Sequence, residues 1–502
     1  MTASFPPINA YYLAYVSFIP LLFALRESTL TSAIFTGFFT GLLHETILLS
    51  WIIPTLTNHA QFSFTYAFSL TIIMSAILAI NFVVFTVLVH FLSKKPYHLF
   101  VLPFLWVSIE FVRSYGQLAF PWELIGYSQY KWITLIQFSD ISGVYGVSGF
   151  VVLINVCIFI CLLFCYQMTW NKQNVSKSLL ALSITFFVCI PIIILTYGSK
   201  QIQQMDHNSD QKQYKKVMIV QPSILQDEKW EGDNRIPITQ KMVNMTFQGK
   251  NKAVDLVVWP ETALPYALHS KHQLRQFVLQ SMKQMNAGLI VGSLSFIEEH
   301  QQTTNFNSAY VIDKNGHIQS RYDKVSLVPF SEFLPYSFLK NLWMFYGAPD
   351  DKFKPGKVGQ VHQLDDFQLG IQICFEIIFP QYARILTANG SNLLINISND
   401  GWFGQTASPY QHFSMAIFRA VENKRALIRC ANTGISGIID PCGRIISQSQ
   451  LYETTSIIHQ VPIVENKHTF YSKWGDFFAI GSMIISLLFG LTQMIIFLKN
   501  DS

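Results

Sequence analysis

Charged residues are scarce in this sequence. They make up 13% of its 502 residues, against about 25% in typical soluble domains, while 50% of the residues are hydrophobic. Only 12 of the 65 charged residues fall within the first 197 positions. This composition excludes a uniformly soluble chain, and it also excludes a disordered one, because so apolar a chain buries ample surface. It indicates a membrane-embedded half followed by a polar half.

The sequence also lacks the patterns of several classes of site. Its seven cysteines are irregularly spaced, with no CxxC pair and no zinc pattern, which argues against a disulfide scaffold and a structural metal site. Whether Cys430 and Cys442 form a pair stays open at this point. The net charge is +5, but no dense Lys/Arg tract or base-stacking motif accompanies it, so a nucleic-acid partner is not expected.

Long apolar runs fill the N-terminal part and return near the C-terminus. A spanning helix needs about 20 mostly apolar residues, and we predict seven, near 8–25, 29–54, 64–92, 97–113, 143–167, 178–198 and 476–498. No basic residue precedes the first run, so it lacks the n-region of a cleavable signal peptide and is expected to remain a helix. The predicted organisation is a transmembrane bundle over 1–198, a linker over 199–216, a soluble domain over 217–470 and a C-terminal transmembrane helix over 475–498.

The basic residues of the short loops predict how the chain crosses the membrane. Lys and Arg accumulate in cytoplasmic loops, and here they fall in alternate connections, at Arg26, Lys94, Lys95, Lys172, Lys177 and Lys499. The polar half would then lie outside the cytoplasm, although Lys131 in the 114–142 connection departs from this pattern. Within the apolar half, Glu110 and Arg113 stand three residues apart, and we expect them to form an ion pair on one helix face.

After residue 216 the apolar runs become short and are bounded by turn residues, which is typical of strands. We predict strands at 217–221, 254–259, 289–293, 309–312, 369–374, 393–398 and 435–439. Helix-like stretches separate several of them, which predicts an α/β domain. One helix start is well marked, because Ser408-Pro-Tyr-Gln411 offers an N-cap serine, a proline at the first position and a glutamine three residues after the cap. That helix is expected to run to about Ala431.

Three side chains with complementary chemistry stand at ends of predicted strands or in the loops that follow. Glu261 comes just after Val257-Val258-Trp259-Pro260, Lys324 lies in the segment 321–335, and Cys374 ends a strand. Taken singly, each is more often structural: a carboxylate at a strand end, a lysine in a surface ion pair, a buried inert thiol. Taken together, they supply a base, a cation and a nucleophile. A thiol with an ordinary pKa of about 8.5 benefits from both partners when it reacts near neutral pH.

The segments VVWPETALP, YDKVSLVPFSEFLP and IQICFE resemble the Glu-Lys-Cys motifs of the nitrilase (carbon-nitrogen hydrolase) superfamily, in the family order. The apolar half is similar to bacterial apolipoprotein N-acyltransferases through FPPINAYYLAYVSFIPLLFAL, WVSIEFVRSYGQLAFPWELIGYSQ and DISGVYGVSGF. The polar half adds VQPSILQDEKW and the stretch 397–445. The resemblance covers about residues 5–498.

This resemblance implies a helical transmembrane bundle that carries a nitrilase-like α-β-β-α sandwich. It implies that a phospholipid donates a fatty acyl chain to Cys374 as a thioester, and that the α-amino group of an apolipoprotein's N-terminal S-diacylglyceryl-cysteine accepts it. Glu261 would act as the base, and Lys324 would stabilise the oxyanion. The implied location is the bacterial inner membrane, with the catalytic domain in the periplasm and with membrane lipid around the bundle. No metal or organic cofactor is implied.

The resemblance also implies roles around these three residues. Glu332 and Glu376 match positions that support them, while Phe375 stands where the family usually has tyrosine, so the ring remains without its hydroxyl. Trp230 and Trp402 match aromatic positions near the family's lipid entrance, although a tryptophan at such a place is also typical of packing or of interfacial anchoring.

Two other interpretations remain. A membrane-tethered amidase or nitrilase would use the same three residues on a small carbon–nitrogen substrate, with water as the acceptor, since pocket shape and lid motion decide whether water is excluded. The several predicted spans disfavour it, because small soluble substrates do not require them. The second alternative is a catalytically silent membrane scaffold, against which the intact Glu261, Lys324 and Cys374 count.

Overall fold

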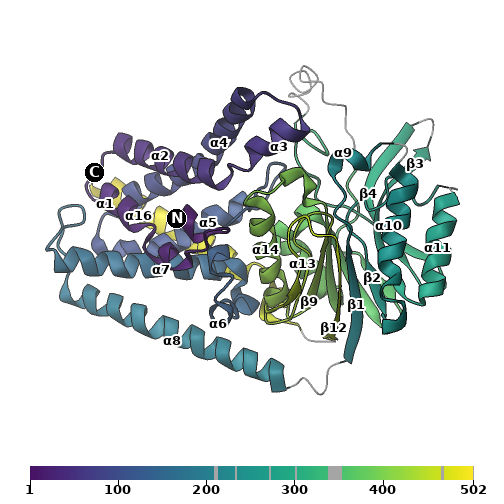
Figure 1. Ribbon diagram of the computed structural model, residues 1–502. Coiled ribbons are helices and arrows are strands. Elements are labelled where there is room, and N and C mark those ends of the chain that lie inside the picture. The colour runs from purple at the N-terminus through teal and green to yellow at the C-terminus, as the bar shows by residue number, and fades with distance from the viewer. Residues whose placement is uncertain are drawn as a thin grey trace.

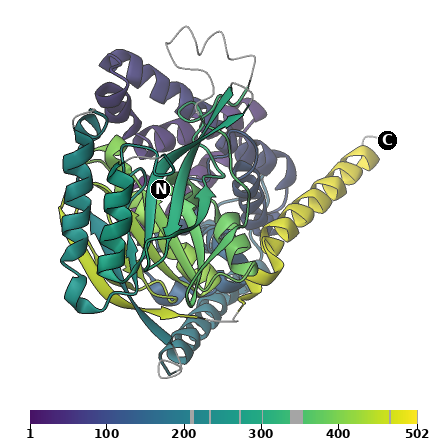
Figure 2. The same ribbon diagram turned by 90° about the vertical axis from the view of Figure 1, so that its right-hand side faces the viewer.

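The computed structural model describes residues 1–207, 213–231, 234–270, 273–299, 302–336, 353–464 and 468–500. Over these residues a helical bundle packs against an α/β domain built on two sheets (Figure 1). The chain passes from the bundle to the α/β domain after helix α8 (Lys177–His207) and returns through helix α16 (Phe477–Asn500), which packs against α5 (Leu102–Arg113). Figure 2 shows α16 extending away from the rest of the molecule.

Several helices of the described chain are long and apolar enough to cross a membrane. They are α4 (Phe64–Leu92), α7 (Ser139–Cys165), α8 and α16, and a fifth span forms if α2 (Leu30–Leu48) and α3 (Ile52–His59), bent by 51°, count as one. The spans predicted at 8–25 and 97–113 are broken into short 3-10 turns and the shorter helices α1 (Ile19–Leu25) and α5, each with a proline in its first turn. These apolar helices indicate a membrane protein.

The ion pair expected between Glu110 and Arg113 is not formed. Arg113 lies 3.2 Å from Glu45 of α2, so the cation ties two helices of the bundle together. Glu110 instead accepts hydrogen bonds from the Trp106 indole and from the backbone N–H of Ile125, both at 2.8 Å. Spacing along one helix places two side chains on the same face, but tertiary contacts decide which partners they meet.

The α/β domain contains two six-stranded sheets. The first has the order β12-β1-β2-β3-β4-β5, with strands Thr455–Ile463, Gln213–Gln221, Leu256–Val258, Gly288–Glu299, Gln302–Ile312 and Ile318–Asp323. The second has the order β11-β10-β9-β8-β7-β6, with strands Ile445–Gln448, Gly437–Ile439, Ala426–Ala431, Leu393–Ser398, Phe367–Ile373 and Val361–Leu364. Strands β1, β2 and β3 are parallel, and so are β7, β8 and β9, so their carboxyl ends meet at one edge of each sheet.

The two sheets pack face to face between two helical layers. Their shared core includes Val217 and Val258 from one sheet and Ile371 and Ile395 from the other. Helices α10 (Arg235–Phe247) and α11 (Gln273–Met285) cover the outer face of the first sheet, and α13 (Pro380–Ala388) and α14 (Ser408–Asn423) cover the second (Figure 1). This arrangement confirms the predicted α-β-β-α sandwich.

Helix α14 lies between the second sheet and the bundle, and nearly all of its residues are buried. Its polar side chains bond to the bundle: Gln411 accepts from the Trp122 indole at 2.8 Å, and Glu422 accepts from the Val144 backbone N–H at 3.0 Å. That N–H is available because Gly143, with φ 65°, breaks the regular course of α7. The α/β domain is therefore fixed to the membrane half by buried hydrogen bonds as well as by apolar packing.

The structure corrects two predicted boundaries. Helix α14 begins at Ser408 as expected but ends at Asn423 and not near Ala431, because Lys424 adopts a left-handed conformation (φ 49°) and 426–431 form β9 beside β8. The stretch 199–216 is not a plain linker, since α8 continues to His207 and β1 begins at Gln213; residues 208–212 lie outside the described chain.

Cys430 and Cys442 are both free thiols.

Each predicted strand has a counterpart in the sheets, with longer bounds for β1, β3 and β4. Strands β5, β6, β9, β11 and β12 were not predicted. Most of these lie toward the edges of the sheets, where polar residues interrupt the apolar pattern.

Candidate active site

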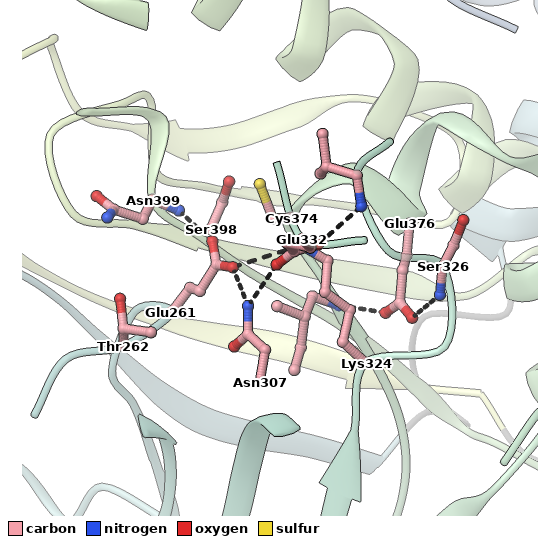
Figure 3. A network of polar contacts seen from close by, with 12 residues as sticks. Glu261, Thr262, Asn307, Lys324, Ser326, Glu332, Cys374, Glu376, Ser398 and Asn399 are labelled. Carbon is pink, nitrogen blue, oxygen red and sulfur yellow. Dashed lines mark hydrogen bonds and ion pairs between the residues drawn. The ribbon is translucent and has the colours of Figure 1, made fainter. Parts of the chain in front are cut away.

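Glu261 follows β2, and its carboxylate faces Asn307 of β4 and Asn399, which follows β8 of the other sheet (Figure 3). It is buried, and hydrogen bonds reach both carboxylate oxygens: the Asn307 side-chain amide donates to Oε1 at 2.7 Å, and the backbone N–H of Asn399 donates to Oε2 at 2.9 Å. The ammonium of Lys324 lies 3.6 Å from Oε1. This carboxylate is held in one orientation beside a cation.

Lys324 comes directly after β5 and is fully buried. Its Nζ lies 2.9 Å from both carboxylate oxygens of Glu332. Burial by itself would lower the pKa of Lys324, but the carboxylates of Glu332 and Glu261 outweigh it and raise the pKa above its usual value. Lys324 therefore stays charged at physiological pH, which suits a group that stabilises negative charge.

Cys374 ends β7 and opens the short turn η9 (Cys374–Ile378). Its backbone is left-handed, with φ 52°, an unusual conformation for a non-glycine residue. Burial raises the pKa of the Cys374 thiol, the nearby Glu261 carboxylate adds to this, and Lys324 opposes it. The thiol is therefore protonated at neutral pH, and its reaction as a nucleophile requires a base. Cys374 is close enough to Glu261 and Lys324 for both charges to act on its thiol.

Glu376 connects the turn that carries Cys374 to the loop that carries Lys324. Its carboxylate accepts hydrogen bonds from the Tyr322 hydroxyl at 2.9 Å and from the backbone N–H groups of Val325, Ser326 and Ile373. Burial raises the pKa of Glu376 to about 7, although these backbone donors oppose the shift. The residue braces the two loops against each other.

The Phe375 side chain is apolar and contacts other aromatic rings. Its ring stacks on Phe120, from the connection between α5 and α7, with centroids 6.2 Å apart and planes 25° apart, and it meets Phe379 edge-on at 5.2 Å. The residue after Cys374 thus contacts the membrane half directly.

Trp230 and Trp402 lie at the surface, with exposed fractions of 46% and 43%. Among the described residues, neither forms a ring contact or hydrogen bond with Glu261, Lys324 or Cys374. Trp402 packs edge-on against His59 of α3, at 5.1 Å between centroids. The His59 ring also hydrogen bonds to the carbonyl of Gly401 at 3.2 Å. Helix α3 of the bundle therefore touches the loop that follows β8.

Four buried groups around the site were missed by the sequence analysis. Asn307 and Asn399 hold Glu261, and Lys229 donates to the Thr262 hydroxyl at 2.7 Å and lies 3.4 Å from the Glu261 carbonyl. Beneath Cys374, the His412 ring contacts the Cys374 carbonyl at 3.2 Å. In the sequence, Asn307, Asn399 and His412 are polar residues within or next to apolar stretches, and Lys229 lies in a charged stretch, so neither pattern distinguishes them from many other residues.

The site is buried and brings together the Cys374 thiol, the Glu261 carboxylate and the Lys324 ammonium, each at or just after the end of a separate strand. Within the described residues, no three His, Cys, Asp or Glu side chains are grouped in a way that would hold a metal ion. A thiol, a carboxylate and a buried ammonium held together are the groups that acyl transfer through a cysteine requires.

Comparison with known proteins identifies the families that the two halves of the chain match. The carbon-nitrogen hydrolase family matches residues 216–467, and the apolipoprotein N-acyltransferase N-terminal domain matches residues 1–157. The fold and site thus define an acyltransferase of the carbon-nitrogen hydrolase superfamily that carries a membrane bundle. More narrowly, the chain belongs to the apolipoprotein N-acyltransferase family.

The relatives that support this assignment are similar along most of their length. The apolipoprotein N-acyltransferase of Geobacter metallireducens is 32% identical over 485 residues, which cover 95% of this chain and 90% of that protein. The enzyme of the same name from Rickettsia prowazekii is 32% identical over 438 residues, 86% of this chain and 82% of that protein. Among solved structures, Saccharomyces cerevisiae Nit3 of the nitrilase superfamily aligns over 52% of this chain and 93% of its own, with 19% identity and a TM-score of 0.40.

Proposed function

We propose that this enzyme transfers a fatty acyl chain from a phospholipid to the α-amino group of an apolipoprotein's N-terminal S-diacylglyceryl-cysteine, through a thioester on Cys374. In the first half-reaction, Glu261 takes the proton of the thiol, and the sulfur attacks the ester carbonyl. The oxyanion forms beside the Lys324 ammonium. When the carbon–oxygen bond breaks, the lysophospholipid leaves with the proton from Glu261, and the acyl chain stays on sulfur.

In the second half-reaction the α-amino group attacks the thioester carbonyl. Glu261 takes a proton from the attacking nitrogen, Lys324 again lies beside the oxyanion, and the carbon–sulfur bond breaks as the amide forms. The Cys374 sulfur regains its proton. The same base and the same cation thus act in both halves, which explains why one compact site suffices for two substrates.

One observation favours a lipid donor over a small soluble amide. The turn that carries Cys374 lies against the membrane half, where Phe375 stacks on Phe120. The hydroxyl of Tyr127 reaches the carbonyl of Ile378 at the end of the same turn, at 3.4 Å. An acyl chain that leaves the bilayer along the bundle would have a short path to the sulfur, whereas a soluble substrate needs no such contact.

The arrangement of the basic loops supports a periplasmic position for the α/β domain. Asn171 bonds through its backbone N–H to the carbonyl of Arg26 at 3.1 Å, and through its side chain to the carbonyl of Ser93 at 2.9 Å. The loops that carry Arg26, Lys94, Lys95 and Lys172 therefore meet at one end of the bundle. Basic loops lie on the cytoplasmic side of bacterial inner membranes, so the opposite side, with the α/β domain, would face the periplasm.

A two-stage transfer assay tests the proposal. Purified enzyme is first incubated with a phospholipid that carries a labelled acyl chain, then washed, then mixed with either a diacylated lipopeptide or buffer. The proposal predicts rapid movement of the label to the lipopeptide amine and slow loss to water. Rapid release of free fatty acid in buffer alone, with no lipopeptide product, would instead identify a hydrolase.

A further inference from the structure

Two buried carboxylates near Cys374 share a single ammonium. Lys324 lies 2.9 Å from Glu332 and 3.6 Å from Glu261. One neutral group closes the remaining side: the Asn307 side-chain nitrogen donates to Glu261 Oε1 at 2.7 Å and to Glu332 Oε1 at 3.1 Å. Glu261, Asn307, Glu332 and Lys324 thus form a closed ring of four groups (Figure 3).

The ring decides which oxygen of Glu261 is left for chemistry. Oε1 faces two donors, the Asn307 amide and the Lys324 ammonium, whereas Oε2 accepts one hydrogen bond, from the backbone of Asn399. A carboxylate oxygen has about two lone-pair sites. Oε2 therefore keeps a site for a proton, and the two donors on Oε1 fix the rotation of the carboxylate that presents it.

Packing alone does not explain an asparagine at position 307, because the residue destabilises the fold there. It sits within β4, with an exposed fraction of 4%, and its carbonyl oxygen Oδ1 is buried and has no hydrogen-bond partner among the described residues. Leaving a buried acceptor unpaired costs stability. The side-chain amide of Asn307 offsets this loss, because it donates hydrogen bonds to the carboxylates of Glu261 and Glu332.

The neutrality of the amide matters as much as its donors. A second cation in its place would bind both carboxylates more tightly and weaken Glu261 as a base, while an apolar side chain would leave two carboxylates close together with fewer donors. Among the described residues, further charged and titratable groups near the ring include Lys229, Cys374, Glu376, Asp400, His412 and Arg429.

We propose that Asn307 is a positioning residue for acyl transfer: its side-chain amide holds Glu261 and Glu332 on the one ammonium of Lys324 and turns Oε2 of Glu261 toward the Cys374 thiol. The inference rests on the proposed roles of Glu261 as base and Cys374 as nucleophile. It gives a strand residue outside the three sequence motifs the role of orienting the base.

The test measures the thiol directly and needs no acyl substrate. Full-length enzyme in detergent is treated with iodoacetamide over a series of pH values, and the rate of alkylation at Cys374 is followed by peptide mass spectrometry. Asn307→Asp replaces two donors with a third carboxylate at nearly constant volume. We expect the acidic midpoint of the Cys374 alkylation profile to move up by about one pH unit, because crowded carboxylates hold protons more tightly.

Two further variants make the result specific. Asn305→Asp introduces the same change two residues earlier on β4, where the side chain is exposed, and should leave the midpoint unchanged. Asn307→Ala removes the donors without adding charge and should move the midpoint in the same direction by less. A lower rate at every pH with an unmoved midpoint in both Asn307 variants, or equal shifts in Asn305→Asp and Asn307→Asp, would overturn the proposal.

This design separates the inference from the proposed function. A shifted alkylation profile together with failure of acyl transfer from phospholipid in wild-type enzyme would uphold the role of Asn307 and reject the lipid donor. Normal acyl transfer with an unmoved profile in Asn307→Asp would do the reverse.

Discussion

The ring of Phe375, the residue after Cys374, stacks on the ring of Phe120 from the membrane half, with centroids 6.2 Å apart. The turn that positions the thiol is thus in contact with the segment that connects two helices of the bundle. Substitutions in that segment should therefore change the position of the Cys374 sulfur.

The first prediction concerns this contact. Phe375→Ala should lower the rate of acylation of Cys374 by about two- to tenfold, since an aromatic pair contributes about 0.5–1.5 kcal/mol beyond its buried area. Phe375→Tyr keeps the ring and should stay close to the wild-type rate. The measurement is single-turnover acylation by a phospholipid in detergent micelles. Equal rates in all three proteins would show that the stack does not position the turn.

The second prediction concerns Lys324. Lys324→Met keeps most of the volume but removes the charge, and it should reduce acyl-enzyme formation by about 100- to 1000-fold, the usual cost of losing an oxyanion-stabilising group. Because the neighbouring carboxylates raise the pKa of Lys324, its deprotonation should not produce a decline of activity between pH 7 and pH 9. A wild-type decline in that range that disappears in Lys324→Met would contradict this assignment.

The third prediction concerns Lys229, which is buried, with an exposed fraction of 1%. Among the described residues, no carboxylate lies within salt-bridge distance of its ammonium. Burial lowers the pKa of Lys229 to about 7, although Glu261 opposes this. Between about pH 7 and pH 10 Lys229 is therefore protonated in the unfolded chain but not in the folded protein, so the contribution of this residue to the free energy of unfolding rises with pH across that window.

Lys229→Met lacks this contribution. Its stability relative to wild type should be highest at pH 6 and should fall as the pH rises to 9. Thermal unfolding at both pH values provides the comparison, with exposed Lys252→Met as the control that should show no such trend. A constant difference between Lys229→Met and wild type would mean that Lys229 does not change its protonation on folding.

The positions of Glu261, Lys324 and Cys374 could be predicted because each stands where a buried strand ends or in the loop just after one, inside a motif of the superfamily. The alternation of strands and helices predicted an α/β domain, and the resemblance to the superfamily implied its two-sheet sandwich. The parallel strands β1 to β3 and β7 to β9 then bring such strand ends together, which motif order alone does not reveal.

The remaining parts depend on contacts between distant segments. Asn307 stands within a strand, and nothing local marks its side chain as the link between Glu261 and Glu332. The partner of Arg113 is on another helix, 68 residues away in sequence. The end of α14 was misjudged because the apolar run that follows Lys424 suits a helix or a strand equally well, and only pairing with β8 selects the strand.

The most direct test of the proposed chemistry is intact mass spectrometry of the purified enzyme after incubation with phospholipid. Wild type and Cys430→Ser, which changes another buried thiol of the same sheet, should each gain the mass of one fatty acyl chain, in a bond cleaved by hydroxylamine at neutral pH. Cys374→Ser should gain no such thioester, and a diacylated lipopeptide should discharge the adduct from the other two. An acyl thioester that persists in Cys374→Ser would place the nucleophile elsewhere and contradict the mechanism.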